Sequence, residues 1–440
     1  MTTLPHLADT IRDVLGRAAN ALARHTGFVQ RQRKLTAAAF VQTLVFGWLD
    51  DPDAPLSHLA ATAAAVGCPV AAQSLDARFS ETAAHLLEAV LAHAIAAVVT
   101  GPDVTTGLLA RFDGVDLIDA TVIGLPAVAA ERWPGLGGNT PAAGAAALKV
   151  ELRLGLADGA VAASLMAGRH HDQRGPLAGE PVRAGSLRVA DLGDVSVERF
   201  AAIDAGGAFW LSRLKLGTVL TDARGARLDV PGVLAGAARM PDGMPVRLGA
   251  TQALPCRLLV RAVPAAAADA RRRRVRRAAT QRGGTASAQQ LALCGWTVLV
   301  TNVPSSRLAA AGAFALYRAR WQIELLFKVW TSRGGLSRSR STRPWRVVCE
   351  VYAKLLAGLV SHWITAASLW QRDSRSGTKA WSVVSSHARH LAVSLVSSCA
   401  LVRALRVVQR VLTSGCRVDR RRRHPSTYQR LTAPEACALT

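Results

Sequence analysis

The sequence predicts an α/β or α+β fold with helical regions at both ends of its 440 residues. Apolar residues recur at helical spacing through residues 1–105, most clearly at 37–49 and 82–99. Short apolar runs separated by turns follow, and they predict strands at 115–123, 148–154, 161–166, 187–190 and 209–214. Helical spacing returns at 309–331, at 347–369 and in the tail to about residue 412. Strands followed by helices in this order favour a sheet covered by helices.

The stretch 222–294 differs in composition from the segments on either side of it. It holds five prolines, the strand-like run 258–263 and the run 271–277, in which six of seven residues are arginine. We predict a β-rich basic insertion here, with a flexible arginine segment. A further strand is predicted directly afterwards, at 296–301.

These shifts in composition divide the chain into five predicted segments. They are a helical domain at 1–105, the first part of a core at 106–221, the insertion at 222–294, the second part of the core at 295–370, and a helical C-terminal region at 371–440 that carries the basic run 420–423.

The charge of the chain is strongly positive. Lysine and arginine number 54 against 30 aspartates and glutamates, which gives a net charge of +24 and an isoelectric point near 11.3. Such a chain attracts polyanions, and nucleic acid is the commonest polyanion in a cell. A basic proteome or a ribosome-associated surface would give the same balance. The cluster Arg31, Arg33 and Lys34 is either a DNA-docking edge of the N-terminal domain or a solvated helix face.

Cysteine usage and hydropathy bear on the compartment. The seven cysteines are scattered without a CxxC pair, which argues against a disulfide framework or a zinc ribbon and fits a reducing cytoplasm. The N-terminus lacks the pattern of a signal peptide. Two apolar stretches, 86–100 and 351–370, contain Glu88, Lys354 and His362, so we expect buried helices rather than membrane spans.

Three acidic residues stand out by their context. Asp119 lies in the strand-like run VDLIDATVIGLP, Asp191 closes the run LRVAD, and Glu324 lies mid-helix in LYRARWQIELLFKVW. Phosphodiester hydrolysis and transesterification commonly use two hard cations about 3.5–4 Å apart. Carboxylates on two neighbouring strands and on a helix above them could hold such ions, which also share the phosphate oxygens of the substrate.

Each acid also has an ordinary structural explanation. An aspartate at a strand end commonly caps a turn, and Glu324 could form a helix salt bridge with Arg320 or Lys328. The run His170-His171-Asp172 follows a strand, but without further ligands at metal-binding spacing it is better explained as a turn or as a supporting group. Trp321 is expected to pack in the core, whereas Trp330 is left open between packing and stacking on a base.

The run YRARWQIELLFK closely resembles the conserved motif of the insertion-sequence-four family of DDE transposases. In this motif a tyrosine, an arginine, the third catalytic acid and a lysine stand at fixed spacings. Here Tyr317, Arg320 and Glu324 match the spacing Y-x2-R-x3-E. Thr331 stands where the family has lysine, and Lys328 is the expected basic substitute.

The resemblance extends over most of the chain. Asp119 in DATVIGLP is similar to the first catalytic aspartate of the family. Asp191 in VADLGDVS is similar to the second, although Asp194 replaces an aromatic residue there. Three further stretches fit the family, namely LDARFS at 75–80, TNVP at 301–304 and PWRVVCEVYAKLLAGL at 344–359.

The resemblance implies a ribonuclease-H-like catalytic core, interrupted by the β-rich insertion before the glutamate-bearing helix. It implies that Asp119, Asp191 and Glu324 bind two Mg²⁺ ions per active site, with Mn²⁺ as an alternative. Tyr317, Arg320 and Lys328 would contact the DNA backbone near the cleaved end.

The resemblance also implies partners and a location. The partners are double-stranded DNA, both the end repeats of a mobile element and the target, and a second copy of the chain in a synaptic homodimer. Residues 1–105 would bind the ends. Cleavage, often through a DNA hairpin, and strand transfer would take place at the nucleoid in a prokaryotic cytoplasm.

Two other interpretations remain open at this point. One is a DNA-binding relic that holds element ends without cutting them, and the departures at Thr331 and Asp194 keep it open. The other is a ribonuclease-H-fold nuclease with a cellular role, such as a resolvase. The arginine runs 271–277 and 420–423 either grip phosphates or are solvated segments.

Overall fold

The computed structural model describes residues 1–30, 34–104, 106–136, 144–170, 175–191, 196–215, 217–372, 375–417 and 427–432. The chain forms two compact units. The first consists of Met1–Val104, Ala120–His171 and Trp321–Arg423, and the second consists of Thr105–Asp119, Asp172–Arg320 and His424–Thr440. Both units are therefore assembled from segments that lie far apart in the sequence.

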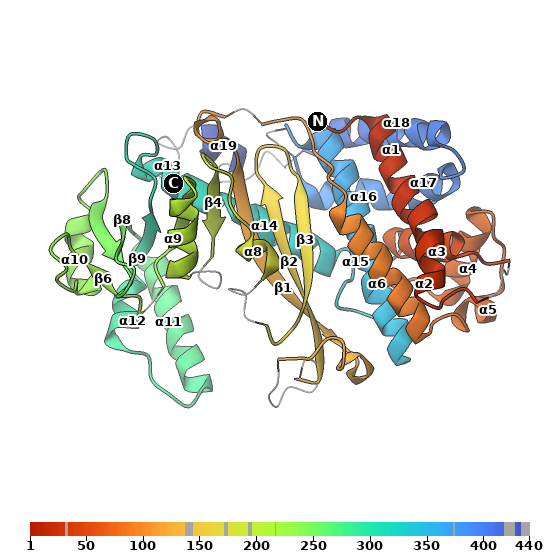
Figure 1. Ribbon diagram of the computed structural model, residues 1–440, viewed down its shortest axis with the longest axis horizontal. Helices are drawn as coiled ribbons and strands as arrows, with labels where there is room; N and C mark the ends of the chain where they lie inside the picture. The colour runs from red at the N-terminus through yellow and green to blue at the C-terminus, as the bar shows by residue number, and fades with distance from the viewer. Residues whose placement is uncertain are drawn as a thin grey trace. The chain divides into compact units, whose positions relative to one another are not determined.

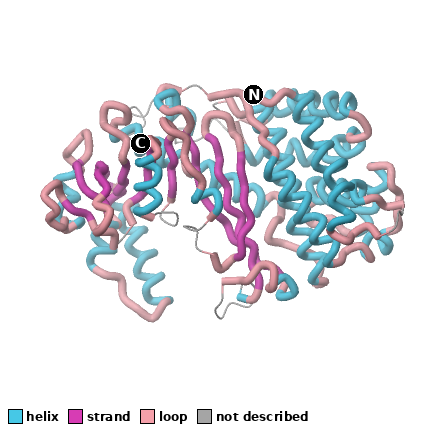
Figure 2. The backbone as a smooth tube through the Cα atoms, viewed as in Figure 1, coloured by secondary structure: helices cyan, strands magenta, loops and turns pink. Residues whose placement is uncertain are grey.

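The strands, magenta in Figure 2, are hydrogen-bonded in the order β3-β2-β1-β4-β5-β9-β8-β7-β6. Pairing is parallel from β1 to β4 and from β4 to β5, and antiparallel in the β2–β3 hairpin and from β5 onward to β6. The strands are β1 (Val115–Leu125), β2 (Ala146–Gly155), β3 (Val161–Ala167), β4 (Leu187–Ala190), β5 (Phe209–Arg213), β6 (Leu220–Thr221), β7 (Met244–Leu248), β8 (Leu254–Ala262) and β9 (Trp296–Thr301). The strands expected from the sequence are confirmed.

Helices dominate the first unit (Figure 1). Those from the N-terminal region are α1 (Leu4–Arg12), the π-helical η1 (Asp13–Ala18), α2 (Ala19–His25), α3 (Ala37–Asp50), α4 (Leu56–Ala65), α5 (Ala72–Asp76) and α6 (Glu81–Ala96). The others are η3 (Ala127–Ala129), α14 (Trp321–Ser332), α15 (Pro344–Leu369), α16 (Gly377–Ser386), α17 (Ala388–Ser394) and α18 (Ser398–Gly415).

The long helix α15 is the central element of the first unit. It packs against α3, α6, α16 and α18. Among the helices in the described residues, α15 alone is long and apolar enough to cross a membrane. However, 94% of its most apolar stretch is buried inside the protein. The prediction of a buried helix here is confirmed, and its apolar faces are accounted for by neighbouring helices.

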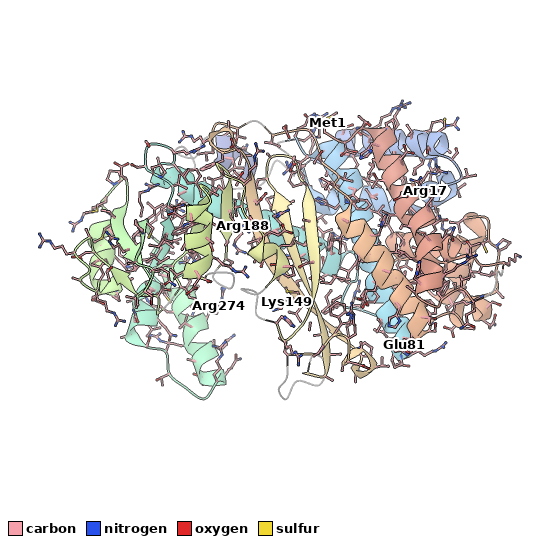
Figure 3. The ribbon with its side chains drawn as sticks, in the orientation of Figure 1. Met1, Arg17, Glu81, Lys149, Arg188 and Arg274 are labelled. Atoms are coloured by element: carbon pink, nitrogen blue, oxygen red, sulfur yellow. The ribbon has the colours of Figure 1, made fainter. Side chains whose placement is uncertain are left out.

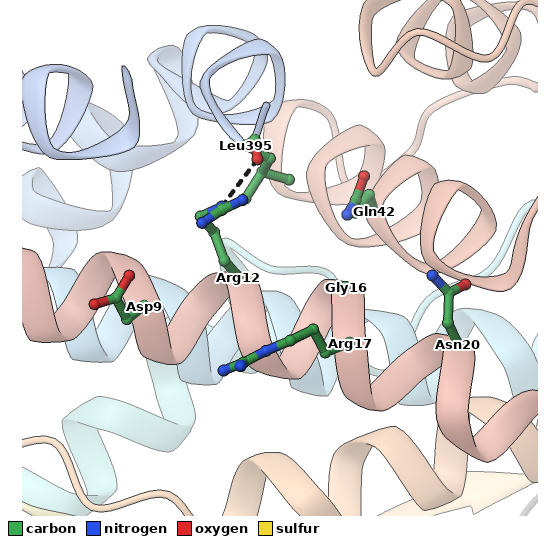
Figure 4. Close-up of a pocket in the computed structure, with 7 residues that line it drawn as sticks. All are labelled: Asp9, Arg12, Gly16, Arg17, Asn20, Gln42 and Leu395. Carbon is green, nitrogen blue, oxygen red and sulfur yellow. Dashed lines mark hydrogen bonds between the residues drawn. The ribbon is translucent and has the colours of Figure 1, made fainter. Parts of the chain in front are cut away.

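Contacts between distant residues join the two ends of the chain within this unit. Arg12 on α1 donates to the Leu395 carbonyl at 3.1 Å and to Ser398 Oγ at 2.6 Å. Ser398 in turn donates to Asp9 Oδ1 at 2.7 Å. A cavity of about 620 Å³ lies beside Arg12, lined by the residues drawn in Figure 4, and it contains none of the candidate catalytic residues.

The second unit has a core in which Trp210 stacks on Phe200, with ring centroids 4.2 Å apart. Leucine and valine side chains from β7, β8 and β9 complete this core. Its helices are η2 (Leu109–Arg111), α8 (Pro176–Gly179), α9 (Val197–Ala205), α10 (Val230–Ala237), α11 (Ala265–Gln281), α12 (Ala288–Leu293), α13 (Ala310–Ala319) and α19 (Thr427–Thr432).

The stretch 222–294 corrects one expectation from the sequence. It contains β7 and β8, but also α10, α11 and α12, so helices contribute more residues than strands do. The arginine run 271–277, expected to be flexible, lies within α11. Alanine and arginine are both strong helix formers, and the alanines on either side of the run extend the helix.

The single helix expected at 309–331 is two helices. α13 ends at Ala319 and α14 begins at Trp321, with Arg320 between them. The Arg320 amide bonds the Tyr317 carbonyl, an i to i−3 bond that tightens the last turn of α13. Glu324 therefore lies in the first turn of α14 rather than in the middle of a helix.

We expect one buried histidine to make folding sensitive to mild acid. His362 on α15 donates from Nε2 to the Gly159 carbonyl at 2.8 Å, and burial lowers its pKa from 6.5 to about 4. Because this pKa is lower in the folded state than in the unfolded state, the unfolded state binds the proton more tightly. The free energy of unfolding is therefore highest above pH 6.5 and decreases as the pH falls towards 4. Between pH 7 and pH 5 the loss is about 2 kcal/mol, measurable by urea unfolding. His362→Gln should flatten this slope, and an unchanged slope would contradict the assignment.

Candidate active site

Parallel pairing of β1 with β4 brings two aspartates to one place. The register pairs Val115 with Leu187 and Leu117 with Val189. Continued by two residues, the same register sets Asp119 opposite Asp191, which directly follows β4. Residues two apart on a strand point to the same face, so both carboxylates are expected on one face of the sheet. The strands expected at 115–123 and 187–190 thus place the first two predicted acids side by side.

A buried arginine within β4, Arg188, ties this strand to the segment around α8. Arg188 is 3% exposed, and its guanidinium donates to the carbonyls of Leu177, Ala178 and Glu180 around α8. These carbonyls lie in and just after the short helix α8, so the guanidinium ties β4 to that helix. The bonds fix the strand three residues before Asp191.

Helix α13 reaches the aspartates because it packs closely on the chain that leads into β1. A Cβ at Gly312 would lie 2.8 Å from a Leu108 methyl and 2.9 Å from a Leu308 methyl, so a larger residue would displace these side chains. Phe314 on the same helix packs under Arg261, whose guanidinium lies 4.2 Å from the ring centroid. The end of α13, with Tyr317 and Arg320, is thereby directed at Asp119 and Asp191.

Arg320 contacts both aspartates. Its Nη1 lies 3.3 Å from Asp119 Oδ2 and 3.7 Å from Asp191 Oδ2. The side chains of Arg320 and Asp119 are 14% and 22% exposed, and that of Asp191 is 35% exposed. Two carboxylates held this close repel each other, and one guanidinium between them offsets that repulsion.

Tyr317 binds the second aspartate from the same helix end. Its hydroxyl donates to Asp191 Oδ1 at 3.0 Å. Burial, and then the neighbouring Asp191 carboxylate, raise the pKa of the Tyr317 phenol well above its usual value of 10. The phenol therefore stays protonated at physiological pH and remains a hydrogen-bond donor to the carboxylate.

Glu324 and Lys328 belong to α14, which lies in the first unit. Lys328 is exposed, and Glu324 is half-buried. Thr331, at the position of the family lysine, bonds the Phe327 carbonyl of its own helix at 2.9 Å. The structure thus brings together Asp119, Asp191, Tyr317 and Arg320, while Glu324 and Lys328 lie one turn apart on the next helix.

Helix α14 is positioned by α15. Trp330 is 3% exposed and lies against Gly358, where a Cβ would come within 3.0 Å of the indole ring. The loop after α14 is fixed by Lys354, which donates to the carbonyls of Gly335 at 3.0 Å and Arg338 at 2.8 Å. Lys354 also pairs with Glu350 at 2.7 Å, so the buried charge is compensated.

One tryptophan of α14 corrects the sequence analysis, and the burial of the other decides a question that the sequence left open. Trp321, expected in the core, is 51% exposed, whereas Trp330 is buried. Both tryptophans lie on the same helix, and only packing distinguishes them: Trp330 faces α15, and Trp321 starts the helix on another face.

Other stretches that carried the resemblance serve the framework. In TNVP, Thr301 Oγ1 donates to the Trp210 carbonyl at 2.6 Å, and Asn302 Oδ1 accepts from the Trp210 amide at 2.8 Å, which ties β9 to β5. In LDARFS, Asp76 pairs with Arg343 and Arg346 at the start of α15. Sequence spacing gave no indication of these partners, because they lie far apart in the chain.

Some residues singled out in the sequence lie outside the described residues. They are Arg31, Arg33, His171, Asp172, Asp194 and the run 420–423. Lys34 and His170 are described and exposed, and the carbonyl of His170 accepts from Lys149 Nζ at 2.5 Å.

The donor chemistry at Asp119 and Asp191 fits a hard divalent cation. Carboxylate oxygens are the ligands that Mg²⁺ and Mn²⁺ prefer, and these two come from adjacent strands. Among the described residues, no group of three or more His, Cys, Asp or Glu side chains is gathered closely enough to hold a metal ion by itself. Two carboxylates with open positions would suit an ion that also binds substrate phosphate.

Comparison with protein families identifies the family to which the segment with both aspartates belongs. The family model described as Transposase DDE domain matches residues 115–359, from β1 into α15. The chain belongs to this family of transposases. The match covers both aspartates, the Tyr317–Glu324 motif and the helix that supports α14, and a DDE domain implies a ribonuclease-H-like core.

Two of the curated relatives of the transposase match about three quarters of its length, and a third matches a shorter part. The chain is 25% identical over 363 residues to the transposase for insertion sequence element IS231B of Bacillus thuringiensis subsp. berliner, covering 76% of this chain and 74% of the relative. It is 24% identical over 374 residues to the transposase for insertion sequence element IS1151 of Clostridium perfringens, covering 79% and 78%. The putative transposase InsL for insertion sequence element IS186A of Escherichia coli (strain K12) is 29% identical over 195 residues, covering 42% and 53%.

The resemblance to the insertion-sequence-four family is thereby confirmed. The protein is a DDE transposase of an insertion sequence element, an enzyme of DNA transposition. Its family generally uses divalent metal ions.

We expect Arg320→Gln to lower the melting temperature of the protein in EDTA. We also expect it to increase the rise in melting temperature that a divalent metal ion produces. The change leaves Asp119 and Asp191 without the guanidinium between them, so the melting temperature should fall by roughly 2–4 °C. Because a divalent cation then relieves the repulsion, the rise in melting temperature on adding Mn²⁺ should exceed that of the wild type. Differential scanning fluorimetry measures both, and Arg318→Gln on the same helix is the matched control. Equal shifts in the two variants would refute the role of Arg320.

Proposed function

We propose that the transposase binds the ends of its element, cleaves them and joins them to target DNA, with Asp119, Asp191 and Glu324 as the catalytic triad. The convergence of Asp119 and Asp191 on Arg320 is the observation that carries this proposal. Glu324 is included in the triad because its spacing from Tyr317 and Arg320 matches the family motif and because it lies in the first turn of α14.

In the proposed site the three carboxylates would hold two Mg²⁺ ions, with Mn²⁺ as an alternative. When bound, such ions supply an activated attacking oxygen and stabilise the leaving oxygen of the phosphodiester. The residues of the chain supply position: β1 and β4 set Asp119 and Asp191 side by side, and the Tyr317 hydroxyl fixes the orientation of the Asp191 carboxylate. Orientation of this kind lowers the cost of reaching a reactive geometry.

The DNA contacts proposed for the motif residues differ in what supports them. Lys328 is exposed one turn beyond Glu324, where a cation can reach a backbone phosphate. Tyr317 and Arg320 contact Asp191 and Asp119, so the contacts described here favour a role in positioning the carboxylates. A phosphate near the site would be a further partner for the same guanidinium.

The remaining parts of the proposal concern partners. Double-stranded DNA, as element ends and as target, fits a net charge of +24. We propose that residues 1–105 contribute to end binding, that 222–294 is an insertion within the catalytic core, and that two copies act together in a synaptic complex at the bacterial nucleoid.

We expect Glu324→Gln to abolish cleavage while DNA binding persists. Losing one carboxylate ligand should cost several kcal/mol at the transition state, or about a thousandfold in rate. The assay uses a labelled duplex that carries the inverted repeat flanking the gene, with Mg²⁺ or EDTA. Glu131→Gln, an exposed glutamate of the same unit, is the matched control.

Each outcome of that assay has a distinct meaning. Metal-dependent cleavage by the wild type and the control, lost in Glu324→Gln, supports the triad. Binding without cleavage in any divalent ion would show a DNA-binding relic. Cleavage that ignores the element end would indicate a nuclease with another role, and full activity of Glu324→Gln would show that the triad is wrongly assigned.

We expect the exposed Trp321 to stack on a base near the cleaved end. Stacking of a base on an aromatic ring is worth about 1–3 kcal/mol, so Trp321→Ala should weaken end binding by roughly five- to a hundredfold. Trp321→Phe should retain most of the affinity. Fluorescence of 2-aminopurine at the terminal positions reports the stacking, and an equal signal with the alanine variant would contradict it.

A further inference from the structure

Helix α11 is the most basic element that the structure describes in the second unit. The segment 264–297, which includes α11 and α12, contains seven arginines and one acid, Asp269, for a local net charge of +6 (seven minus one). None of the candidate catalytic residues lies in it. A charge density this high repels itself, so it is retained at a cost to stability unless a polyanion binds there.

Two of the arginines of α11 have partners within the second unit, and one of them, Arg271, attaches the helix to β9. Arg271 donates to the Trp296 carbonyl at 3.1 Å, and burial lowers its pKa. Arg272 pairs with Asp269 at 2.7 Å, and Ala268 is 3% exposed against the rest of the unit. The first half of the helix is therefore anchored, and its only acidic residue is already paired with a cation of the same helix.

The other four arginines face solvent. Arg273, Arg274, Arg276 and Arg277 are exposed, and Arg274 is labelled on α11 in Figure 3. At 1.5 Å per residue they occupy about 6 Å of helix length, and at 100° per residue they cover one broad side of it. Duplex DNA carries one phosphate charge per about 1.7 Å of its axis, so several phosphates lie within reach of these guanidiniums.

We propose that the exposed side of α11 binds the sugar-phosphate backbone of duplex DNA irrespective of sequence. The proposal rests on the proposed function, because that function supplies duplex DNA as the partner. Charge complementarity selects this occupant: a basic helix without free acids suits a uniform polyanion, and arginine forms bidentate bonds with phosphate. Backbone contacts add affinity and orientation, whereas sequence is read elsewhere.

The test removes the four charges and measures DNA binding in EDTA, where cleavage does not interfere. The variant carries Arg273→Gln, Arg274→Gln, Arg276→Gln and Arg277→Gln; glutamine has nearly the helix propensity of arginine, so α11 should persist. The control carries Arg224→Gln, Arg227→Gln, Arg239→Gln and Arg247→Gln, exposed positions in the same unit. Both proteins have a formal charge of +20, which is 24 minus four.

Affinity is measured for two duplexes, the element end and an unrelated sequence of equal length, across a range of salt concentrations. Each lost phosphate contact reduces the slope of log K against log salt by about 0.9, so four contacts reduce it by about 3.6. At about 0.1 M salt the variant should lose at least roughly tenfold in affinity for both duplexes relative to the control. Circular dichroism verifies that the helical content is equal.

The possible results separate this inference from the proposed function. A variant whose salt slope and affinity equal those of the control overturns the role of α11 while leaving the proposed function intact. A loss confined to the element end would show base readout and overturn backbone binding. Failure of the wild type to bind either duplex would overturn the proposed function itself, and this inference with it.

Discussion

The parallel pairing of β1 with β4 is the constraint on which the candidate site depends. A parallel register fixes which residues leave adjacent strands together, and here it sets Asp119 opposite Asp191. Two carboxylates in this arrangement need a cation between them. Arg320 supplies one, and its guanidinium lies within 4 Å of both. A site that attracts a guanidinium in this way is also suited to a divalent metal, since both respond to the same concentrated negative charge.

Packing within the first unit positions α14, the helix that carries Glu324. α15 is covered by helices from both ends of the sequence, and its glycine at 358 lets Trp330 dock α14 at close range. Lys354 and Glu350, buried as a pair, fix the loop that follows. Much of the sequence that resembles the family is therefore framework: TNVP and LDARFS join elements rather than contact the aspartates. A rigid framework is what preorganised carboxylates require.

Electrostatics in this transposase operates at two scales. At the site, single pairings decide geometry, as with Tyr317 and Asp191. Over the surface, the excess of 24 positive charges attracts DNA without specifying a sequence. α11 concentrates that excess on one helix, in which the arginine that anchors it, Arg271, is distinct from the exposed ones. A single run of arginines can thus contribute both to folding and to binding.

The sequence by itself determined the strands, most helices, the family and the two aspartates, because periodicity and motif spacing are local properties. It could not determine that 271–277 is helical, since charge alone suggested a flexible segment. Packing decided the roles of Trp321 and Trp330, because the side of α14 that meets α15 is a tertiary property. The tertiary structure also decided that Arg320 faces Asp119 and Asp191: motif spacing predicts which residues share a helix end, but only the register of distant strands places carboxylates beside them.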